Sequence, residues 1–278
     1  MNLLQAVVLG VVEGVSEFLP ISSTGHLTIT ENLLGLSVDD PGVTAFTAII
    51  QLGAIAAVII YFRTDIALTT RAWFRGVLTP SARSGFEYRL GWYVIVGSVP
   101  IGVVGFVGRD VVSGPLRSLW VVAAALILWS VVMVAAERRA TQSRGEQDLT
   151  LRDTIVIGAV QCLSLIPGVS RSGATISAGL FRGLDRVTAT RLSFFLSIPA
   201  LTAAGIHQSV TEAGAISTTV GWLPTLVGTA VSMVVAYASI AWLLRLVAHH
   251  PISIFVGYRV VLGIALLAAL YTGALNAT

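Results

Sequence analysis

The sequence predicts an all-α polytopic membrane protein, built as an inverted-topology repeat of six transmembrane helices plus two re-entrant helix-break-helix hairpins. Three observations lead to this prediction: the composition, the order of apolar segments and the placement of arginine. Of the 278 residues, 55% are hydrophobic and 11% are charged, and the mean hydropathy is +0.86. Since a soluble domain carries about 25% charged residues, this apolar excess has to face a lipid bilayer.

The same composition excludes several classes of protein. The hydrophobicity excludes a disordered chain, and the single cysteine, Cys162, excludes a disulfide-rich module and a multi-cysteine zinc site. All 17 basic residues are arginine and the net charge is +3. In a membrane protein such residues mark the cytoplasmic side, so we expect no nucleic-acid partner. We expect no cleavable signal peptide, because the first apolar stretch contains Glu13 and Glu17.

Apolar runs predict the transmembrane helices, each of which needs about 20 residues to cross a bilayer. They lie at residues 43–62, 90–107, 119–136, 192–210, 222–247 and 252–271. The apolar part of the run at 192–210 is the shortest, ending at Ile206, and it spans a bilayer when it is extended through His207 to Val210 or when neighbouring helices shield it.

Two further apolar segments, residues 3–34 and 155–180, are interrupted. Pro20 and small polar residues break the first, and Pro167 with Gly168 and a similar run break the second. Proline removes a backbone donor and glycine loosens a helix. Broken backbone survives at membrane depth only where protein buries it or where it lines a wet cavity. Each segment is therefore predicted to be a re-entrant hairpin.

Arginine placement orients these segments. With the connection at 63–89 on the cytoplasmic side, 13 arginines are cytoplasmic and two, Arg109 and Arg117, lie outside, as the positive-inside rule requires. The remaining pair, Arg171 and Arg259, falls within apolar segments. Arg259 lies about two helical turns into the last span, so we expect it to snorkel to the cytoplasmic interface.

A shift of 148 residues aligns the two broken segments without a gap, so that Glu13 meets Gln161 and residues 22–25 meet 170–173. We expect one membrane domain, residues 1–278, with a first repeat at 1–136 and a second at 154–278. Because three spans separate the two broken segments, the second enters from the opposite face. In such repeats the two breaks meet near the bilayer midplane and form one polar site.

The first break carries paired carboxylates. Glu13 and Glu17 are four residues apart and share one helix face. Two carboxylates in a low-dielectric region persist only when something compensates their charge. A divalent cation shared with substrate phosphate is the natural compensator, although a shared proton or an arginine would also serve, and a structural pair is the alternative. Gln51 and Gln161, at similar depth, are expected to make packing hydrogen bonds.

Hydroxyl and imidazole groups follow the carboxylates directly. Ser22, Ser23 and Thr24 are candidate nucleophiles or donors to phosphate. Their alternative role is to satisfy backbone groups that the break frees. His26, three residues after Ser23, is a candidate general base or acid, or else a partnered interior histidine.

The second break places one arginine among small residues at a helix start. Ser170, Arg171, Ser172 and Gly173 combine free backbone N–H groups, the positive end of a helix dipole and a guanidinium fork. This combination predicts a phosphate-binding site. In the alternative interpretation, Arg171 only neutralises one of the two glutamates.

On these residues, the chain resembles the undecaprenyl-diphosphate phosphatases of the bacitracin-resistance family. Both signature segments are intact, EGVSEFLPISSTGH at 13–26 and PGVSRSGATIS at 167–177. The resemblance implies an enzyme of the bacterial inner membrane that hydrolyses undecaprenyl diphosphate to the monophosphate, recycles the lipid carrier for cell-wall synthesis and confers bacitracin resistance. It also implies a divalent cation, magnesium or calcium.

The residues and the resemblance fit one mechanism. Ser23 attacks the terminal phosphorus with His26 as proton acceptor, and water then hydrolyses the phospho-enzyme. Arg171, the N–H groups of 170–173 and a cation on the two glutamates neutralise the developing charge. Direct attack by water, with His26 or a glutamate as base, is the alternative.

A lipid-phosphate transporter or flippase of the same architecture is the alternative function. A scaffold without chemistry leaves the intramembrane charges unexplained. The expected partners are the lipid substrate and the bilayer, and the sequence leaves open whether two copies form a homodimer. The orientation places the break at 22–26 on the outward-opening side, which predicts hydrolysis at or near the periplasmic face.

Overall fold

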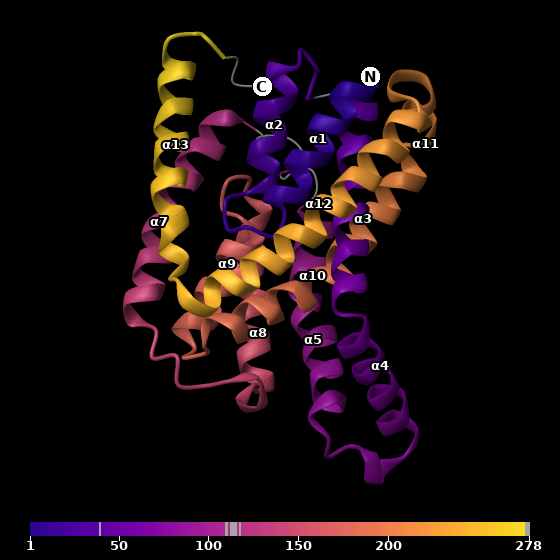
Figure 1. The fold of residues 1–278 in the computed structure, drawn as a ribbon, viewed down its shortest axis with the longest axis vertical. Helices are drawn as coiled ribbons and strands as arrows, with labels where there is room; N and C mark the ends of the chain where they lie inside the picture. The colour runs from indigo at the N-terminus through magenta and orange to yellow at the C-terminus, as the bar shows by residue number, and fades with distance from the viewer. Residues whose placement is uncertain (39, 109–110, 112–115, 117, 276–278) are drawn as a thin grey trace.

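The computed structural model describes residues 1–38, 40–108, 111, 116 and 118–275, and these residues are predominantly helical (Figure 1). Apart from one isolated bridge between Arg144 and Leu184, they contain no β-structure. Six helical segments among them are long and apolar enough to cross a membrane. They are α3 (Pro41–Tyr61), α5 (Phe86–Val107), α7 (Leu119–Arg139), α10 (Arg186–Thr211), α12 (Trp222–His249) and a last span, Ile252–Tyr271, which contains α13 (Val256–Tyr271). The all-α fold class with six membrane-length apolar helices is confirmed, while the inverted-topology repeat stays a prediction.

Local signals explain where the spans begin. Asp40 accepts hydrogen bonds from the N–H groups of Gly42 and Val43, and Pro41 occupies the first helical position of α3, where its missing N–H costs nothing. Asp185 caps α10 by accepting from the N–H of Thr188. Because this cap lies upstream of the apolar run, α10 is 26 residues long, and the marginal fourth span reaches the length of the others.

One helix, α4 (Arg63–Leu78), is absent from the hydropathy pattern. It lies in the connection that the arginine count assigns to the cytoplasm, and it mixes arginine with apolar side chains. An added Cβ at Gly76 would lie 2.3 Å from the Tyr88 ring, and one at Gly91 would lie 2.8 Å from Trp73. This close packing joins α4 to α5 in the arm that extends away from both termini in Figure 1.

Both interrupted segments form helix pairs. The first consists of α1 (Leu3–Ser16) and α2 (Ser23–Leu33), and the second of α8 (Leu151–Gln161) and α9 (Arg171–Phe181). Each pair returns to the side from which it starts. Gln5 Nε2 donates to Leu34 O at 3.2 Å in the first pair, and Arg182 Nε donates to Asp153 Oδ1 at 2.8 Å in the second. The helix-break-helix pattern is therefore present, while re-entry into a bilayer stays a prediction.

A buried carboxylate ties the ends of the second pair together. Asp153 is fully buried at the start of α8, where it binds Arg144 Nη2 at 2.6 Å and Arg182 Nε at 2.8 Å. Burial by itself raises the pKa of Asp153, but hydrogen bonds from Arg144, Thr150 and Arg182 outweigh it and hold that pKa below its ordinary value. Asp153 therefore stays ionised, and it fixes the end of α9 against the start of α8.

Each helix pair packs against the opposite half of the chain through glycine. An added Cβ at Gly10 in α1 would lie 2.5 Å from the carbonyl oxygen of Gly228 in α12. One at Gly158 in α8 would lie 2.1 Å from the carbonyl oxygen of Gly97 in α5. Backbones approach this closely only where no side chain intervenes. These contacts hold the two pairs in the middle of the bundle.

Replacing Gly158 with alanine is expected to destabilise the fold by about 1–3 kcal/mol, because a methyl group overlaps the α5 backbone and forces α8 outward. The measurement is the midpoint of thermal unfolding in detergent. The matched control is Gly102→Ala in α5, where an added Cβ meets nothing within 4 Å and alanine favours the helix. Equal midpoints for the two variants would contradict the close packing of α8 on α5.

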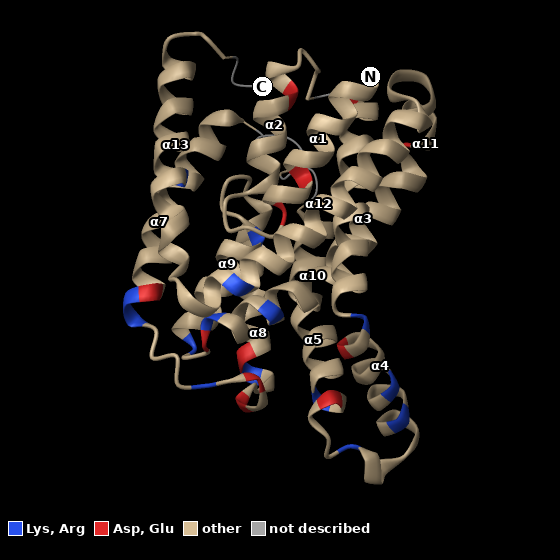
Figure 2. Cartoon of the chain, viewed as in Figure 1, with Lys and Arg blue, Asp and Glu red and all other residues tan. Residues whose placement is uncertain are grey.

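Arginine placement in space follows the predicted asymmetry among the described residues. Figure 2 shows most of the blue residues at the end of the molecule opposite the two termini, on α4, on α8 and in the neighbouring loops. Arg109 and Arg117, the two predicted on the outer side, lie outside the described residues. Which end faces the cytoplasm stays a prediction.

Candidate active site

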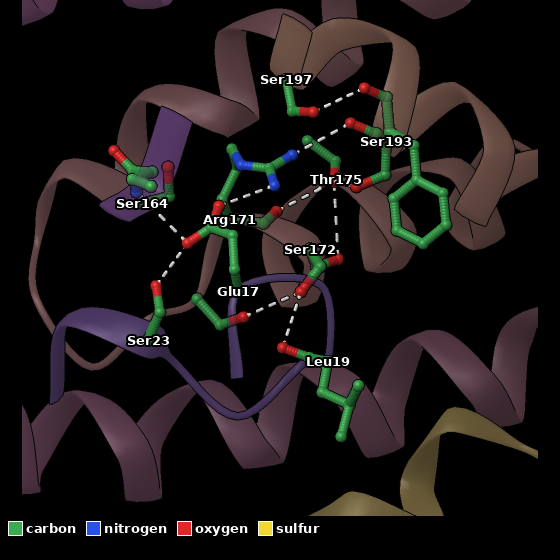
Figure 3. Close-up of polar contacts among 12 residues, drawn as sticks. Glu17, Leu19, Ser23, Ser164, Arg171, Ser172, Thr175, Ser193 and Ser197 are labelled. Carbon is green, nitrogen blue, oxygen red and sulfur yellow. Dashed lines mark hydrogen bonds and ion pairs between the residues drawn. The ribbon is translucent and has the colours of Figure 1, made fainter. Parts of the chain in front are cut away.

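The two breaks contact one another in the interior of the molecule. Gly168 N donates to Ser22 Oγ at 3.1 Å, and Ser172 Oγ donates to Leu19 O at 2.9 Å. These hydrogen bonds join residues that are about half the chain apart in sequence. The polar side chains of α2 and α9 are thereby brought into one site (Figure 3).

Two serines open the helices that start at the breaks. Ser22 and Ser170 have left-handed backbone angles, with φ of 78° and 76°, which non-glycine residues rarely adopt. Their hydroxyls accept hydrogen bonds from Gly25 N at 3.4 Å and Gly173 N at 3.2 Å. Both serines therefore cap helices, the structural role that the sequence left open. The shift of 148 residues relates the two positions.

Glu17 lies at the centre of the site. Its Oε1 accepts from Arg171 Nη2 at 2.9 Å, and its Oε2 accepts from Ser23 Oγ at 2.6 Å and from Gln51 Nε2 at 3.3 Å (Figure 3). Glu17 is 5% exposed and Arg171 is 9% exposed, so the pair is shielded from solvent. Gln51 was expected to make only a packing hydrogen bond, but it binds the central carboxylate.

Arg171 is held from the opposite side by α10. Its Nη1 donates to Ser193 O at 3.0 Å, and the Thr175 hydroxyl lies 2.7 Å from Ser193 Oγ. Its Nε has no hydrogen-bond partner among the described residues. The guanidinium therefore has a fixed orientation, and its Nε–H is free to donate to a ligand. No sequence signal distinguishes Ser193 from the other serines of the spans.

Glu13 is fully buried, and neither of its carboxylate oxygens has a hydrogen-bond partner within the described ranges. A buried, unpartnered carboxylate is costly unless it holds a proton or a cation. No group of three or more His, Cys, Asp or Glu side chains suited to a metal occurs among the described residues. Two carboxylates nonetheless fit a cation that takes its other oxygen ligands from a phosphate and water. Glu13 and Glu17 are the residues that could hold it.

Among the hydrogen bonds of the described residues, none joins His26 to Ser23, although the sequence pairs them as base and nucleophile. Its Nδ1 lies 2.7 Å from Ser22 O, and its Nε2 lies 2.6 Å from the hydroxyl of Tyr258. The Ser23 hydroxyl donates to Glu17 instead. Thr24, the third hydroxyl of the run, is exposed.

Arg259 does not snorkel, and that expectation is wrong. Its side chain is fully buried. Its Nη1 donates to Pro20 O at 2.9 Å, and its Nη2 donates to the carbonyl oxygens of Gly168 at 2.9 Å and Val169 at 3.2 Å. Because the first turn of α13 faces the breaks, the guanidinium binds carbonyls that the broken helices leave free. The position of Arg259 near the end of a span concealed this role.

Comparisons with known proteins cover almost the whole chain. A family model described as "Bacitracin resistance protein BacA" matches residues 6–265. A Frankia casuarinae protein named "Undecaprenyl-diphosphatase 3" is 58% identical over 278 residues and covers 100% of both chains. Proteins named "Undecaprenyl-diphosphatase" from Acidothermus cellulolyticus and from a Mycobacterium species are 55% and 48% identical, again over 100% of each chain.

Proposed function

The chain belongs to the bacitracin resistance protein BacA family, and we propose that it hydrolyses undecaprenyl diphosphate to undecaprenyl phosphate and inorganic phosphate. The observation that carries this function is the buried pair of Glu17 and Arg171, 2.9 Å apart, beside the hydroxyl of Ser23. The reaction returns the lipid carrier to cell-wall synthesis and confers bacitracin resistance. The chain is a multi-pass membrane protein, and we place it in the bacterial inner membrane.

Arg171 is the main phosphate ligand of the proposed site. The terminal phosphate competes with Glu17 for the guanidinium, whose Nε is unused. The start of α9 lies beside it, and its backbone N–H groups favour an anion through the helix dipole. The N–H of Gly173 and the hydroxyl of Ser172 already donate to Ser170 Oγ and Leu19 O, so they bind a phosphate only in exchange for those contacts. Ser22 and Ser170 act by shaping the two helix starts, and the exposed hydroxyl of Thr24 is available as a donor to the phosphate.

Ser23 is the nucleophile in the proposed reaction. Its hydroxyl lies 2.6 Å from Glu17 Oε2, so the carboxylate, rather than His26, is placed to take the proton. Ser23 Oγ bonds to the terminal phosphorus while the bond from phosphorus to the bridging oxygen breaks, and undecaprenyl phosphate leaves. Water then hydrolyses the phosphoserine. Direct attack by water, with Glu17 or His26 as base, is the competing route.

Trapping distinguishes these routes. Acid quenching of the enzyme with substrate labelled in the terminal phosphate is expected to leave label on Ser23, with none on the Ser23→Ala variant. Substantial activity in Ser23→Ala, together with no trapped label, would establish direct attack by water.

Glu13 and Glu17 are the residues that would hold a divalent cation, magnesium or calcium. The cation supplies positive charge against the phosphoryl oxygens. Chelation is expected to lower activity at least 100-fold, with recovery on adding back either metal. The variant Glu13→Gln distinguishes a bound cation from a proton shared by the two carboxylates. Glutamine resembles a protonated glutamate but is a weaker cation ligand. A Glu13→Gln variant with full activity would exclude Glu13 from cation binding.

Phosphate release from the purified protein in detergent tests the function itself. The wild type is expected to release inorganic phosphate from undecaprenyl diphosphate, and Arg171→Ala is expected to be inactive. A transporter or flippase, which the architecture also permits, would release none.

The site opens toward the periplasm in this proposal. Ser22 is buried and Thr24 is exposed, so a labelling probe belongs at Thr24. In a Cys162→Ala background, Thr24→Cys is expected to react with an impermeant thiol reagent added outside intact cells. Labelling only after the cytoplasm is opened would reverse the orientation.

A further inference from the structure

We propose that Tyr258 is a positioning residue of the active site that acts through His26. Its hydroxyl lies 2.6 Å from His26 Nε2, and the two rings stack with centroids 5.6 Å apart and planes 15° apart. Tyr258 is 49% exposed, so packing of α13 does not require it to be aromatic. The inference rests on the proposed function, with His26 as the proton acceptor for the water that hydrolyses the phosphoserine.

The hydrogen bonds fix one tautomer of His26. A backbone carbonyl only accepts, so the Nδ1 that contacts Ser22 O at 2.7 Å has to carry a proton. In the neutral ring, Nε2 is then the bare nitrogen, and the Tyr258 hydroxyl donates to it. Nε2 is therefore the only position at which this histidine gains or loses a proton.

A tyrosine hydroxyl suits this position because it both donates and accepts. It donates to bare Nε2, and it accepts from Nε2–H once the imidazole is protonated. The contact from Nδ1–H to Ser22 O persists in both states. His26 can therefore exchange a proton at Nε2 without turning its ring, and the half-exposed hydroxyl connects that nitrogen to the surface.

Arg259, the next residue in the chain, helps to hold Tyr258 in place beside His26. Arg259 is locked to carbonyls of both breaks through three hydrogen bonds, so the backbone at Tyr258 is fixed relative to Ser22 and His26. A hydrogen bond from a residue anchored in this way orients the imidazole more tightly than a mobile surface tyrosine would.

The test is Tyr258→Phe, which keeps the ring stack and removes only the hydroxyl. We expect kcat for phosphate release to fall about 10-fold, less than the 100-fold or more typical of losing a general acid or base, with KM within about twofold of wild type. Tyr237→Phe is the matched control, because Tyr237 is also half-exposed and packs its ring on another tyrosine. Its kcat is expected to stay unchanged.

A double variant separates positioning from a general loss of structure. In a His26→Ala background, adding Tyr258→Phe is expected to change nothing further, because the hydroxyl acts only through the imidazole. A second readout is nitrogen NMR of the histidine ring, with the His26 signals assigned by their loss in His26→Ala. Wild type is expected to show the Nδ1–H tautomer with a hydrogen-bonded Nε2, and Tyr258→Phe the same tautomer with the Nε2 resonance shifted by the loss of that hydrogen bond.

Unchanged kcat in Tyr258→Phe, an equal loss of kcat in the His26→Ala background, or an unchanged Nε2 resonance would each overturn the inference. A wild-type protein that releases no phosphate would instead overturn the proposed function, so the two failures are distinguishable.

Discussion

Glu17→Gln is expected to lower kcat/KM for phosphate release by about 1,000-fold or more. The substitution keeps the shape of the side chain but replaces one oxygen with an NH2 group. That group has to face Arg171 Nη2 or the hydroxyl of Ser23, which are both donors at 2.9 and 2.6 Å from the present oxygens. The variant therefore loses the proposed proton acceptor and one ligand of the proposed cation together.

Steady-state phosphate release in detergent measures this effect. Glu87→Gln is the matched control, because Glu87 is exposed at the start of α5, and its activity is expected to equal wild type. A Glu17→Gln variant that keeps more than about a tenth of wild-type kcat/KM would contradict Glu17 as base, since removal of a general base costs about 100-fold or more.

Arg259→Leu is expected to produce the largest loss of stability of any single substitution considered, about 3–5 kcal/mol. Leucine leaves the carbonyl oxygens of Pro20, Gly168 and Val169 buried without their donor, and each unsatisfied acceptor costs about 1–3 kcal/mol. Because those carbonyls belong to both breaks, activity is expected to fall with stability. Unfolding by denaturant in detergent provides the measurement.

Two further variants make this result interpretable. Arg138→Leu at the exposed end of α7 is expected to change stability by no more than about 0.5 kcal/mol. Arg259→Lys keeps the charge but has no planar fork to reach all the acceptors, so an intermediate loss is expected. A stability of Arg259→Leu within about 1 kcal/mol of wild type would contradict the role of Arg259 at the breaks.

The candidate site residues could be identified from the sequence because the free energy of burying a charged group depends on the segment that carries it. Glu13, Glu17 and Arg171 are charged groups within apolar segments, and the price of desolvating a charge depends on its immediate surroundings. Pro20 and Gly168 likewise predict broken helices from their own backbone chemistry. Ser23 and His26 were identified by type, but their pairing was not, because one turn of α2 directs the first to Glu17 and the second to Tyr258.

Other residues of the site could not be predicted from the sequence, and Arg259, Tyr258 and Gln51 show why. Arg259 reaches Pro20, 239 residues earlier in the chain, and no spacing rule connects the two. No spacing rule identifies the partners of the arginines that were counted only as markers of orientation, either. Arg144 and Arg182 share buried Asp153, and Arg186 pairs with Glu137. Positive charge near a span end predicts a side of the membrane, but which carboxylate it meets depends on packing.

By itself, the sequence determined that this is a helical membrane protein with six spans, two broken helix pairs and a few charges at membrane depth. These properties follow from transfer free energies and backbone chemistry that act within one segment. Only the tertiary structure decided that Glu17 accepts the hydrogen bond of Ser23, that Glu13 has no partner in the part of the chain described and that Arg259 joins the two breaks. Hydrogen bonds and ion pairs act over about 3 Å, so their partners are set by how distant helices pack.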